Sequence, residues 1–158
     1  MDVADVVKHK GGAILTLSEN QPLSAAIALM AANKVGAVVI TSLRDGAPLG
    51  IVSEADIVAM LSTHGDRGMD RPAQKAMRSP APHCSASETV ATALAMMTRA
   101  RSRYLIAIAE GGVVLGLISI GDLVKARLES AEMEASVLRD VARGRILAGL
   151  EREAGGWR

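Results

Sequence analysis

Aromatic residues are almost missing from this chain of 158 residues, which has no phenylalanine, one tyrosine and one tryptophan. It therefore lacks the stacking surfaces on which many proteins hold single-stranded nucleic acid. Its net charge of +1 also gives no general attraction to phosphate backbones or anionic lipids. We expect neither a nucleic-acid partner nor a membrane partner. The 49% of hydrophobic residues are mostly aliphatic residues and methionine, which are sufficient for a buried core.

Cysteine is nearly absent too, because Cys84 is the only one. An internal disulfide is thus excluded, which is typical of proteins in a reducing compartment. The residues after Met1 do not have the pattern of a signal peptide, and no uninterrupted apolar stretch is long enough to span a bilayer. We expect a soluble protein of the cytoplasm.

Signatures of catalysis and of metal binding are also missing. The chain has no Gly-x-Ser-x-Gly elbow and no P-loop, and residues 111–116 do not fit Gly-x-Gly-x-x-Gly. His9, His64 and His83 are scattered, and His83 and Cys84 would point to opposite faces of a strand. We expect an exposed His83, a buried Cys84, and neither an enzyme, a metal site nor an obligatory cofactor.

What the chain does contain is one pattern written twice, Gly-apolar-apolar-Ser-x-x-Asp, at residues 50–56 and 116–122. The repetition extends upstream, where a helical apolar pattern recurs in the same order. Its members are Leu23, Ala26, Ile27 and Met30 in the first copy and Val90, Ala93, Leu94 and Met97 in the second. Such self-similarity predicts two copies of one structural unit.

Each unit is predicted to run strand, helix, strand, strand, helix, after a short helix at residues 3–8. Glycine-containing dipeptides at 45–46 and 111–112 predict the hairpin turns. Asn20 and Ser87 are the expected N-caps of the first helix in each unit. The expected elements are strands 13–17, 37–41, 49–52, 83–84, 104–109 and 113–118, helices 23–32 and 90–100, and helices that begin after Ser53 and Ser119.

The predicted fold class is therefore α+β, with domains at 1–66 and 75–130 and a polar linker at 67–74. Residues 131–158 follow as a third segment, an amphipathic helix with a charged tail from 151 that is expected to fray. The apolar face of this helix either covers the core of the two domains or forms a dimer interface, and the sequence leaves both possibilities open. The apolar residues of this helix are Met133, Val137 and Val141, with Leu138, Leu147 and Leu150 beside them.

The repeated Ser-x-x-Asp has two interpretations. As a capping box, Ser and Asp would satisfy free amides at the start of a helix. Alternatively, the place where a buried strand leads into a helix offers unpaired N–H groups to a phosphate, with the Ser hydroxyl as a further donor. An Asp one turn further on can accept hydrogen bonds from both hydroxyls of a ribose. The second interpretation predicts a nucleotide site in each unit.

The sequence resembles the cystathionine beta-synthase (CBS) domain, present as a tandem pair, or Bateman module. The resemblance lies in Gly-Ile-Val-Ser-Glu-Ala-Asp-Ile, in Gly-Leu-Ile-Ser-Ile-Gly-Asp-Leu-Val-Lys, in the Ala-Ile-x-Leu-Met and Ala-Leu-x-Met-Met helices, and in Arg-x-Arg-Tyr-Leu, and it covers residues 1–130. It implies two units packed sheet to sheet about a pseudo-twofold axis, with two clefts for adenosine compounds.

The resemblance also implies roles for individual residues. The motif serines, Ser53 and Ser119, would contact phosphate, and the motif aspartates, Asp56 and Asp122, would contact ribose. The adenine would lie near the start of the first hairpin strand of each unit. The residues at that place are Ala37 and Val38 in the first unit and Tyr104 and Leu105 in the second.

The two clefts are not expected to be equal. Arg99, Arg101 and Arg103 precede Tyr104, whereas the matching stretch of the first unit offers only Lys34. Because arginine forks suit phosphate oxygens, we expect the cleft with Ser119 and Asp122 to prefer a phosphorylated ligand. The cleft with Ser53 and Asp56 is expected to be weaker or empty. An alternative is that these arginines merely favour the helix dipole and solvent.

These observations predict a non-catalytic regulatory module that binds an adenosine compound and signals by conformational change to a protein target of unknown identity. The candidate ligands that the resemblance implies are AMP, ADP, ATP, NADH and S-adenosylmethionine. A homodimer is expected. The alternative is a constitutive homodimeric interaction scaffold that holds no ligand.

Overall fold

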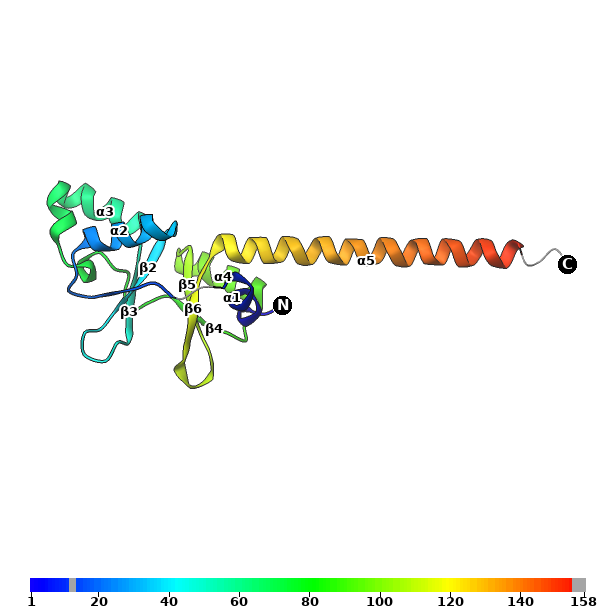
Figure 1. Ribbon diagram of the computed structural model, residues 1–158, viewed down its shortest axis with the longest axis horizontal. Coiled ribbons are helices and arrows are strands. Elements are labelled where there is room, and N and C mark those ends of the chain that lie inside the picture. The colour runs from blue at the N-terminus through cyan, green and yellow to red at the C-terminus, as the bar shows by residue number, and fades with distance from the viewer. Residues whose placement is uncertain (12–13, 155–158) are drawn as a thin grey trace. The chain divides into compact units, whose positions relative to one another are not determined.

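Residues 1–11 and 14–154 are described by the computed structural model, in which the chain divides into two units, Met1–Leu123 and Val124–Arg158. Among its described residues, the first unit contains two three-stranded sheets (Figure 1). In each sheet the first strand pairs in parallel with the second, which forms an antiparallel hairpin with the third. The sheets consist of β1 (Thr16–Ser18), β2 (Ala37–Thr41) and β3 (Pro48–Ser53), and of β4 (His83–Ser85), β5 (Tyr104–Ile108) and β6 (Val114–Ser119).

Helices complete each repeat in the order that the sequence predicts, so the predicted α+β fold of two β-α-β-β-α repeats is confirmed. Both hairpins turn at the predicted glycines, since Gly46 and Gly111 have positive φ angles of 70° and 78°. The helices are α1 (Val3–Lys10), α2 (Leu23–Asn33), α3 (Glu54–His64), α4 (Val90–Ala100) and α5 (Ile120–Ala154).

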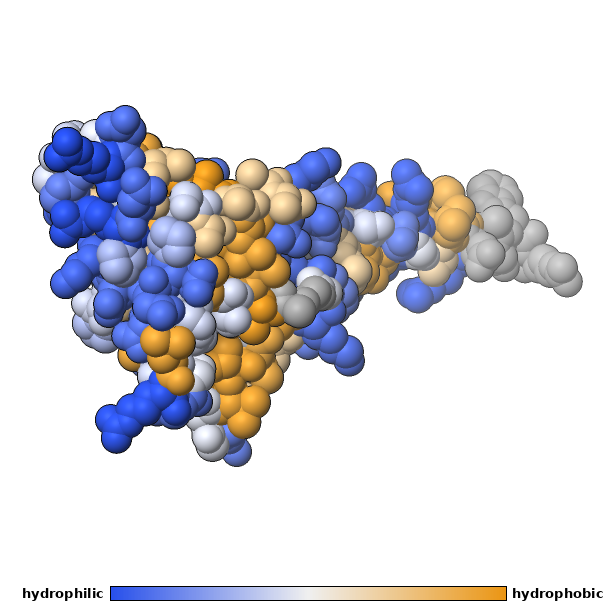
Figure 2. All heavy atoms as spheres, turned by 60° about the vertical axis from the view of Figure 1, so that its left-hand side comes forward, coloured by the Kyte–Doolittle hydropathy of each residue, from blue (hydrophilic) through white to orange (hydrophobic). Residues whose placement is uncertain are grey.

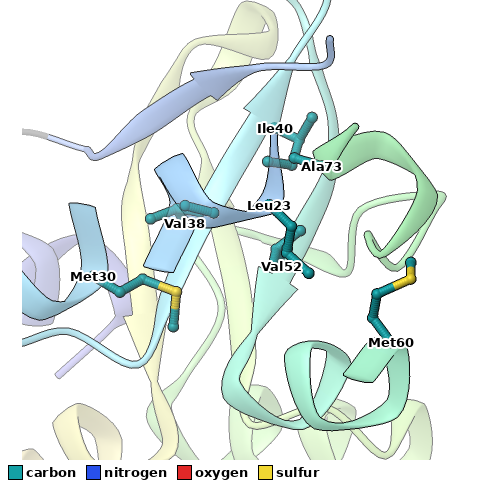
Figure 3. Close-up of a cluster of buried hydrophobic side chains, with 8 residues drawn as sticks. Leu23, Met30, Val38, Ile40, Val52, Met60 and Ala73 are labelled. Atoms are coloured by element: carbon teal, nitrogen blue, oxygen red, sulfur yellow. The ribbon is translucent and has the colours of Figure 1, made fainter. Parts of the chain in front are cut away.

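Alternate residues of β2 serve two different cores. Val38 faces α2 and packs with Leu23 in a cluster of buried apolar side chains (Figure 3). Val39, its neighbour, belongs to a second cluster, in which Ile51 of the same sheet meets Ile106 of the other sheet. Because successive strand residues point to opposite faces, the nearly continuous apolar run of β2 covers both a helix layer and a sheet-to-sheet interface.

The segment before each repeat packs against the other repeat. The amides of Val3 and Ala4 donate to carbonyl groups before α4, Val3 to Glu88 at 2.9 Å. In the same way the amide of Leu23 donates to the carbonyl of Arg71 at 2.8 Å. The expected linker, 67–74, therefore lies on the first repeat, ordered by short 3-10 helices at Gly65–Asp70 and Ala73–Lys75.

The glycine that opens each motif makes room for these segments. A Cβ on Gly50 would lie 2.6 Å from the carbonyl oxygen of Arg78, and one on Gly116 would lie 3.1 Å from a methyl group of Val7. The first contact is with backbone, which cannot rotate away. Gly50 is thus needed for the close approach of the segment that contains Arg78, whereas the constraint at Gly116 is weaker because the Val7 side chain can move.

Two predicted caps are wrong. The N-cap of α2 is Pro22 instead of Asn20, because the carbonyl of Arg71 already accepts from the first helical amide. The N-cap of α4 is Thr89, whose hydroxyl accepts from the amide of Thr92 at 3.1 Å, while the Ser87 hydroxyl pairs with that of Ser85 instead. The preference of Asn and Ser for N-cap positions indicated that each helix begins nearby. Which residue caps the helix is decided by the path of the chain.

The other differences concern the ends of elements. The first strand covers Thr16–Ser18 rather than 13–17. β3 is one residue longer at each end than the predicted 49–52, and β6 lies one residue later than the predicted 113–118. The helix expected in the third segment is a continuation of α5, which runs unbroken from Ile120 to Ala154. Ala13 and residues 155–158 of the predicted tail lie outside the described residues. In the described part of the chain, no helix combines the length and apolarity that crossing a membrane requires.

Candidate functional site

Both Ser-x-x-Asp motifs stand where a hairpin strand ends and a helix begins, β3 to α3 and β6 to α5 (Figure 1). The amide of Ser53 donates to Asp56 Oδ2 at 2.8 Å, and the amide of Ser119 donates to Asp122 Oδ2 at 2.8 Å. The capping interpretation is therefore correct for both. In the hydrogen bonds found among the described residues the two carboxylates use Oδ2, which leaves Oδ1 of each available as an acceptor.

Ser53 and Asp56 line a cleft of about 370 Å³ together with residues of the second repeat. We call it the arginine cleft, because Arg78, Arg101 and Arg103 also line it. Arg101 is the C-cap of α4 in the left-handed region, with φ 49°. The side chain of Arg78 supports this turn, since its Nη1 donates to the carbonyl of Arg101 at 2.9 Å.

Ser119 and Asp122 line a second cleft, of about 530 Å³, which we call the lysine cleft after Lys10 and Lys34. Lys34 is the C-cap of α2, with φ 54°, and thus the counterpart of Arg101. Lys10 Nζ donates to Asp122 Oδ2 at 2.8 Å and to the carbonyl of Leu117 at 3.0 Å.

The charge of Asp122 is stabilised in this arrangement. Burial acts to raise the pKa of its carboxyl, but the hydrogen bonds from Lys10 and from the amide and hydroxyl of Ser119 outweigh burial. The pKa of Asp122 is therefore below its ordinary value. The carboxylate is ionised at neutral pH and can accept hydrogen bonds from a ligand.

The structure corrects the expected pairing of motifs and cations. We predicted that Arg101 and Arg103 would serve the cleft of Ser119 and Asp122, but they line the cleft of Ser53 and Asp56. The reason is that each cleft combines the motif of one repeat with the helix-to-strand loop of the other. The expectation that the cleft of the first motif is the weaker one loses its basis, because that cleft holds the arginines.

Tyr104 lies between the two repeats and lines both clefts. Its hydroxyl occupies the space beside Gly36, where a Cβ would overlap it. Burial and the nearby carboxylate of Glu54 raise the pKa of Tyr104, so its hydroxyl remains a hydrogen-bond donor at neutral pH.

The residues predicted to lie near the adenine fall into two groups, because successive residues of a strand point to opposite faces of the sheet. Ala37 and Tyr104 line the clefts, whereas Val38 and Leu105, with exposed fractions of 0% and 1%, are buried and line neither. Arg99, the third arginine of the stretch, lines neither cleft and is exposed. For Val38 and Leu105, only the backbone is left as a group that could meet a ligand.

Two cationic residues of the clefts were missed from the sequence, Lys10 and Arg78. Both lie in the segments before a repeat, outside the duplicated pattern, so repetition gave no signal for them. The packing of these segments on the opposite repeat brings them to the clefts.

The described residues offer neither a cluster of metal ligands nor a reactive cysteine. No group of three or more His, Cys, Asp and Glu side chains in that part of the chain could hold a metal ion. As predicted, His83 is exposed and Cys84 is buried. Burial, with a smaller contribution from Glu88, raises the pKa of the Cys84 thiol to about 11, so the thiol stays neutral.

Comparison with known proteins identifies these repeats. The family model of the CBS domain matches the chain twice, at residues 3–63 and 73–129. The chain belongs to the CBS domain family. It is a tandem CBS protein, in which each family match covers one β-α-β-β-α repeat and the segment before it. A comparison with curated proteins gave no match.

Solved structures of other CBS proteins share the fold. A CBS-domain containing protein from Agrobacterium tumefaciens is 33% identical, with a TM-score of 0.75 over 80% of this chain and 92% of the other. A protein with CBS domains from Burkholderia ambifaria, described as a signal-transduction protein, is 30% identical, with a TM-score of 0.74 over 82% and 95%. A CBS domain protein from Pyrobaculum aerophilum, complexed with AMP, is 24% identical, with a TM-score of 0.69 over 77% and 89%.

Proposed function

We propose that this tandem CBS protein is a non-catalytic regulatory module that binds an adenine nucleotide or a related adenosyl compound in the clefts between its repeats. Binding changes the relative stability of alternative arrangements of the module, and a protein target responds to the change. The module acts as a homodimer in the cytoplasm. One CBS protein of the same fold, from Pyrobaculum aerophilum, is complexed with AMP.

One observation carries the proposal. In each cleft the Ser-Asp motif of one repeat lies beside cationic side chains that come from the other repeat and from the segment before that repeat. A carboxylate is a suitable acceptor for the two hydroxyls of a ribose, and arginine or lysine is a suitable donor to phosphate. The volumes of about 370 and 530 Å³ lie within the range of small-molecule sites.

The arginine cleft is the stronger candidate for a phosphorylated ligand. Within the described residues, the salt bridges are Lys10–Asp122 and Lys125–Glu129, so Arg101 and Arg103 are not engaged by a carboxylate. In the lysine cleft, by contrast, Lys10 already pairs with Asp122. A ribose that binds Asp122 must share or displace this ammonium group, and affinity there is correspondingly lower.

Thermal unfolding in the presence of AMP, ADP, ATP, NADH and S-adenosylmethionine tests the proposal. A ligand at one hundred times its Kd adds about 2.7 kcal/mol to the free energy of unfolding. We expect a clear rise in Tm with at least one compound. If no compound raises Tm at millimolar concentration, the alternative of a scaffold without ligand replaces the proposal.

The contribution of each cleft follows from calorimetric titration of two matched variants. Asp56→Asn and Asp122→Asn remove a charge but keep an oxygen that can cap the helix, so the fold is preserved. Asp56→Asn is expected to weaken the tighter binding step by about tenfold or more, because a charged acceptor is lost. Unchanged binding in both variants would contradict the assignment of the motif aspartates.

A further inference from the structure

Some of the apolar side chains of α5 between Val124 and Leu150 form a coiled-coil seam. Starting at Val124, one series of apolar residues recurs at steps of four, three, four, three and four residues, which is the heptad spacing. Ile146 and Leu150 continue the series at four-residue steps. The six residues of the regular seam are Val124, Leu128, Ala131, Ala135, Leu138 and Ala142.

The seam residues are exposed along the helix. The exposed fractions of Val124, Leu128 and Leu138 are 53%, 59% and 69%, and Ile146 and Leu150 are exposed by 63% and 58%. Figure 2 shows apolar side chains at the surface of α5 among the charged ones. An apolar seam on a helix of 35 residues is stable in water when a second helix covers it.

The flanking charges indicate what covers the seam. With Leu128 and Ala135 at heptad position a, Arg127 and Glu134 occupy g positions, and Glu132 and Arg139 occupy e positions. In a parallel pair of identical helices, each g residue faces the e residue five positions later in the partner. Arg127 then faces Glu132 of the partner, and Glu134 faces Arg139 of the partner. Each of these pairs joins a positive and a negative side chain.

The next flanking pair of the parallel arrangement is apolar. Val141 occupies the following g position and would face Ile146, at e, across the interface. This contact extends the apolar seam beyond Ala142, where the regular spacing ends.

An antiparallel pair of these helices, overlapping over the same seam residues, is unfavourable. When Leu128 packs across from Leu138 of an antiparallel copy, each e residue faces an e residue and each g residue a g residue. Glu132 then faces Glu132, Glu134 faces Glu134, and Lys125 faces Arg139. All three are pairs of like charge, which destabilise an interface.

We propose that α5 binds a second copy of this chain as a parallel, in-register coiled coil through the Val124–Ala142 seam. This inference concerns α5 alone and does not depend on nucleotide binding. The seam differs from the stripe of Met133, Val137 and Val141, which has four-residue steps. Met133 and Val137 lie away from the interface, and this stripe reaches the interface only at Val141, in its flanking g position.

Sedimentation equilibrium of the full chain tests the seam. The wild type is expected to be a dimer, and Leu138→Glu is expected to raise the Kd of the dimer more than about 100-fold, since a buried apolar residue is lost in both chains. Val137→Glu is the matched control, an adjacent exposed residue off the seam, and is expected to change the Kd by less than about threefold. A monomeric wild type, or a larger effect of Val137→Glu, would overturn the proposal.

Charge reversal tests the orientation. Glu134→Arg and Arg139→Glu are each expected to raise the Kd about fivefold, because each creates two like-charge pairs per dimer, and the double variant is expected to restore it. Residues 134 and 139 do not face each other within one helix, so a restored Kd reports contact between chains. Failure of the double variant to recover would refute the parallel register.

Oxidative cross-linking tests the register in a Cys84→Ser background, which removes the only natural cysteine. Ala131→Cys lies on the seam and is expected to give a disulfide-linked dimer within minutes of adding oxidant. Met133→Cys, on the opposite side of the same turn, is expected to cross-link at least tenfold more slowly. Equal rates would show that the two helices are not paired through the seam.

Discussion

Arg103 illustrates how a residue's role depends on which repeat it faces. Its position three residues after α4 suggested a partnership with the motif of its own repeat, yet it lines the cleft of Ser53 and Asp56. Sequence distance is a poor guide here, because the helix-to-strand loop of one repeat packs beside the motif of the other.

Replacement of Arg103 by Ala is therefore expected to weaken binding of AMP in the arginine cleft. Hydrogen bonds to a charged group contribute about 1.5–3 kcal/mol, which corresponds to a rise in Kd of about 10- to 100-fold. Arg99→Ala is the control, since Arg99 is exposed and lines neither cleft, and its Kd is expected to match the wild type. Calorimetric titration measures both. Equal losses in the two variants would indicate general charge attraction instead of a specific contact.

Lys10 and Asp122 form a pH-dependent contact. The pKa of Asp122 is lowered in the folded protein, so its contribution to stability is present above the unfolded value of about 3.9 and is lost as the pH falls through the folded value. Because Lys10 is 39% exposed, the contribution is about 1 kcal/mol or less.

Lys10→Met is thus expected to lower Tm by a few degrees at pH 7 and by much less below about pH 4, where Asp122 becomes protonated. Thermal denaturation followed by circular dichroism over this pH range gives the comparison. A difference in Tm that stays constant from pH 7 to pH 3 would show that the ion pair does not stabilise the fold.

At the scale of elements, the paired strands and helices follow from the sequence, while the segments that join them do not. Apolar runs such as 37–41 predict strands because local pattern and burial on both faces agree. The cap at Pro22 could not be predicted, because a distant carbonyl, that of Arg71, removes the need for a side-chain cap on α2. The cap at Thr89 is local, but Ser87 and Thr89 are both suitable residue types, and only the structure shows that Thr89 accepts from the helix.

The two motif glycines differ in what an added methyl group would contact. Gly50→Ala is expected to destabilise the protein by about 2–3 kcal/mol, because its Cβ would lie 2.6 Å from a backbone oxygen. Gly116→Ala is expected to cost less, since its neighbour at 3.1 Å is the end of the Val7 side chain, which can move. Urea denaturation of both variants measures the difference. Equal losses would mean that the contact with Arg78 is not the reason for the glycine.

At the scale of the whole molecule, duplication made the fold predictable, because two copies of one pattern limit the chain to two copies of one unit. The clefts were less predictable for the same reason. Duplication identifies Ser53, Asp56, Ser119 and Asp122, but Lys10 and Arg78 come from segments outside the repeated pattern. They reach the clefts only when the two repeats pack together.

The central claim is that the clefts between the CBS repeats hold an adenosine compound. A difference electron-density map from crystals soaked in AMP tests it most directly. We expect a ribose beside the carboxylate of Asp56 and a phosphate within hydrogen-bond distance of Arg101 or Arg103. A map without added density in either cleft, from crystals soaked at a concentration that saturates any binding seen in solution, would contradict the claim.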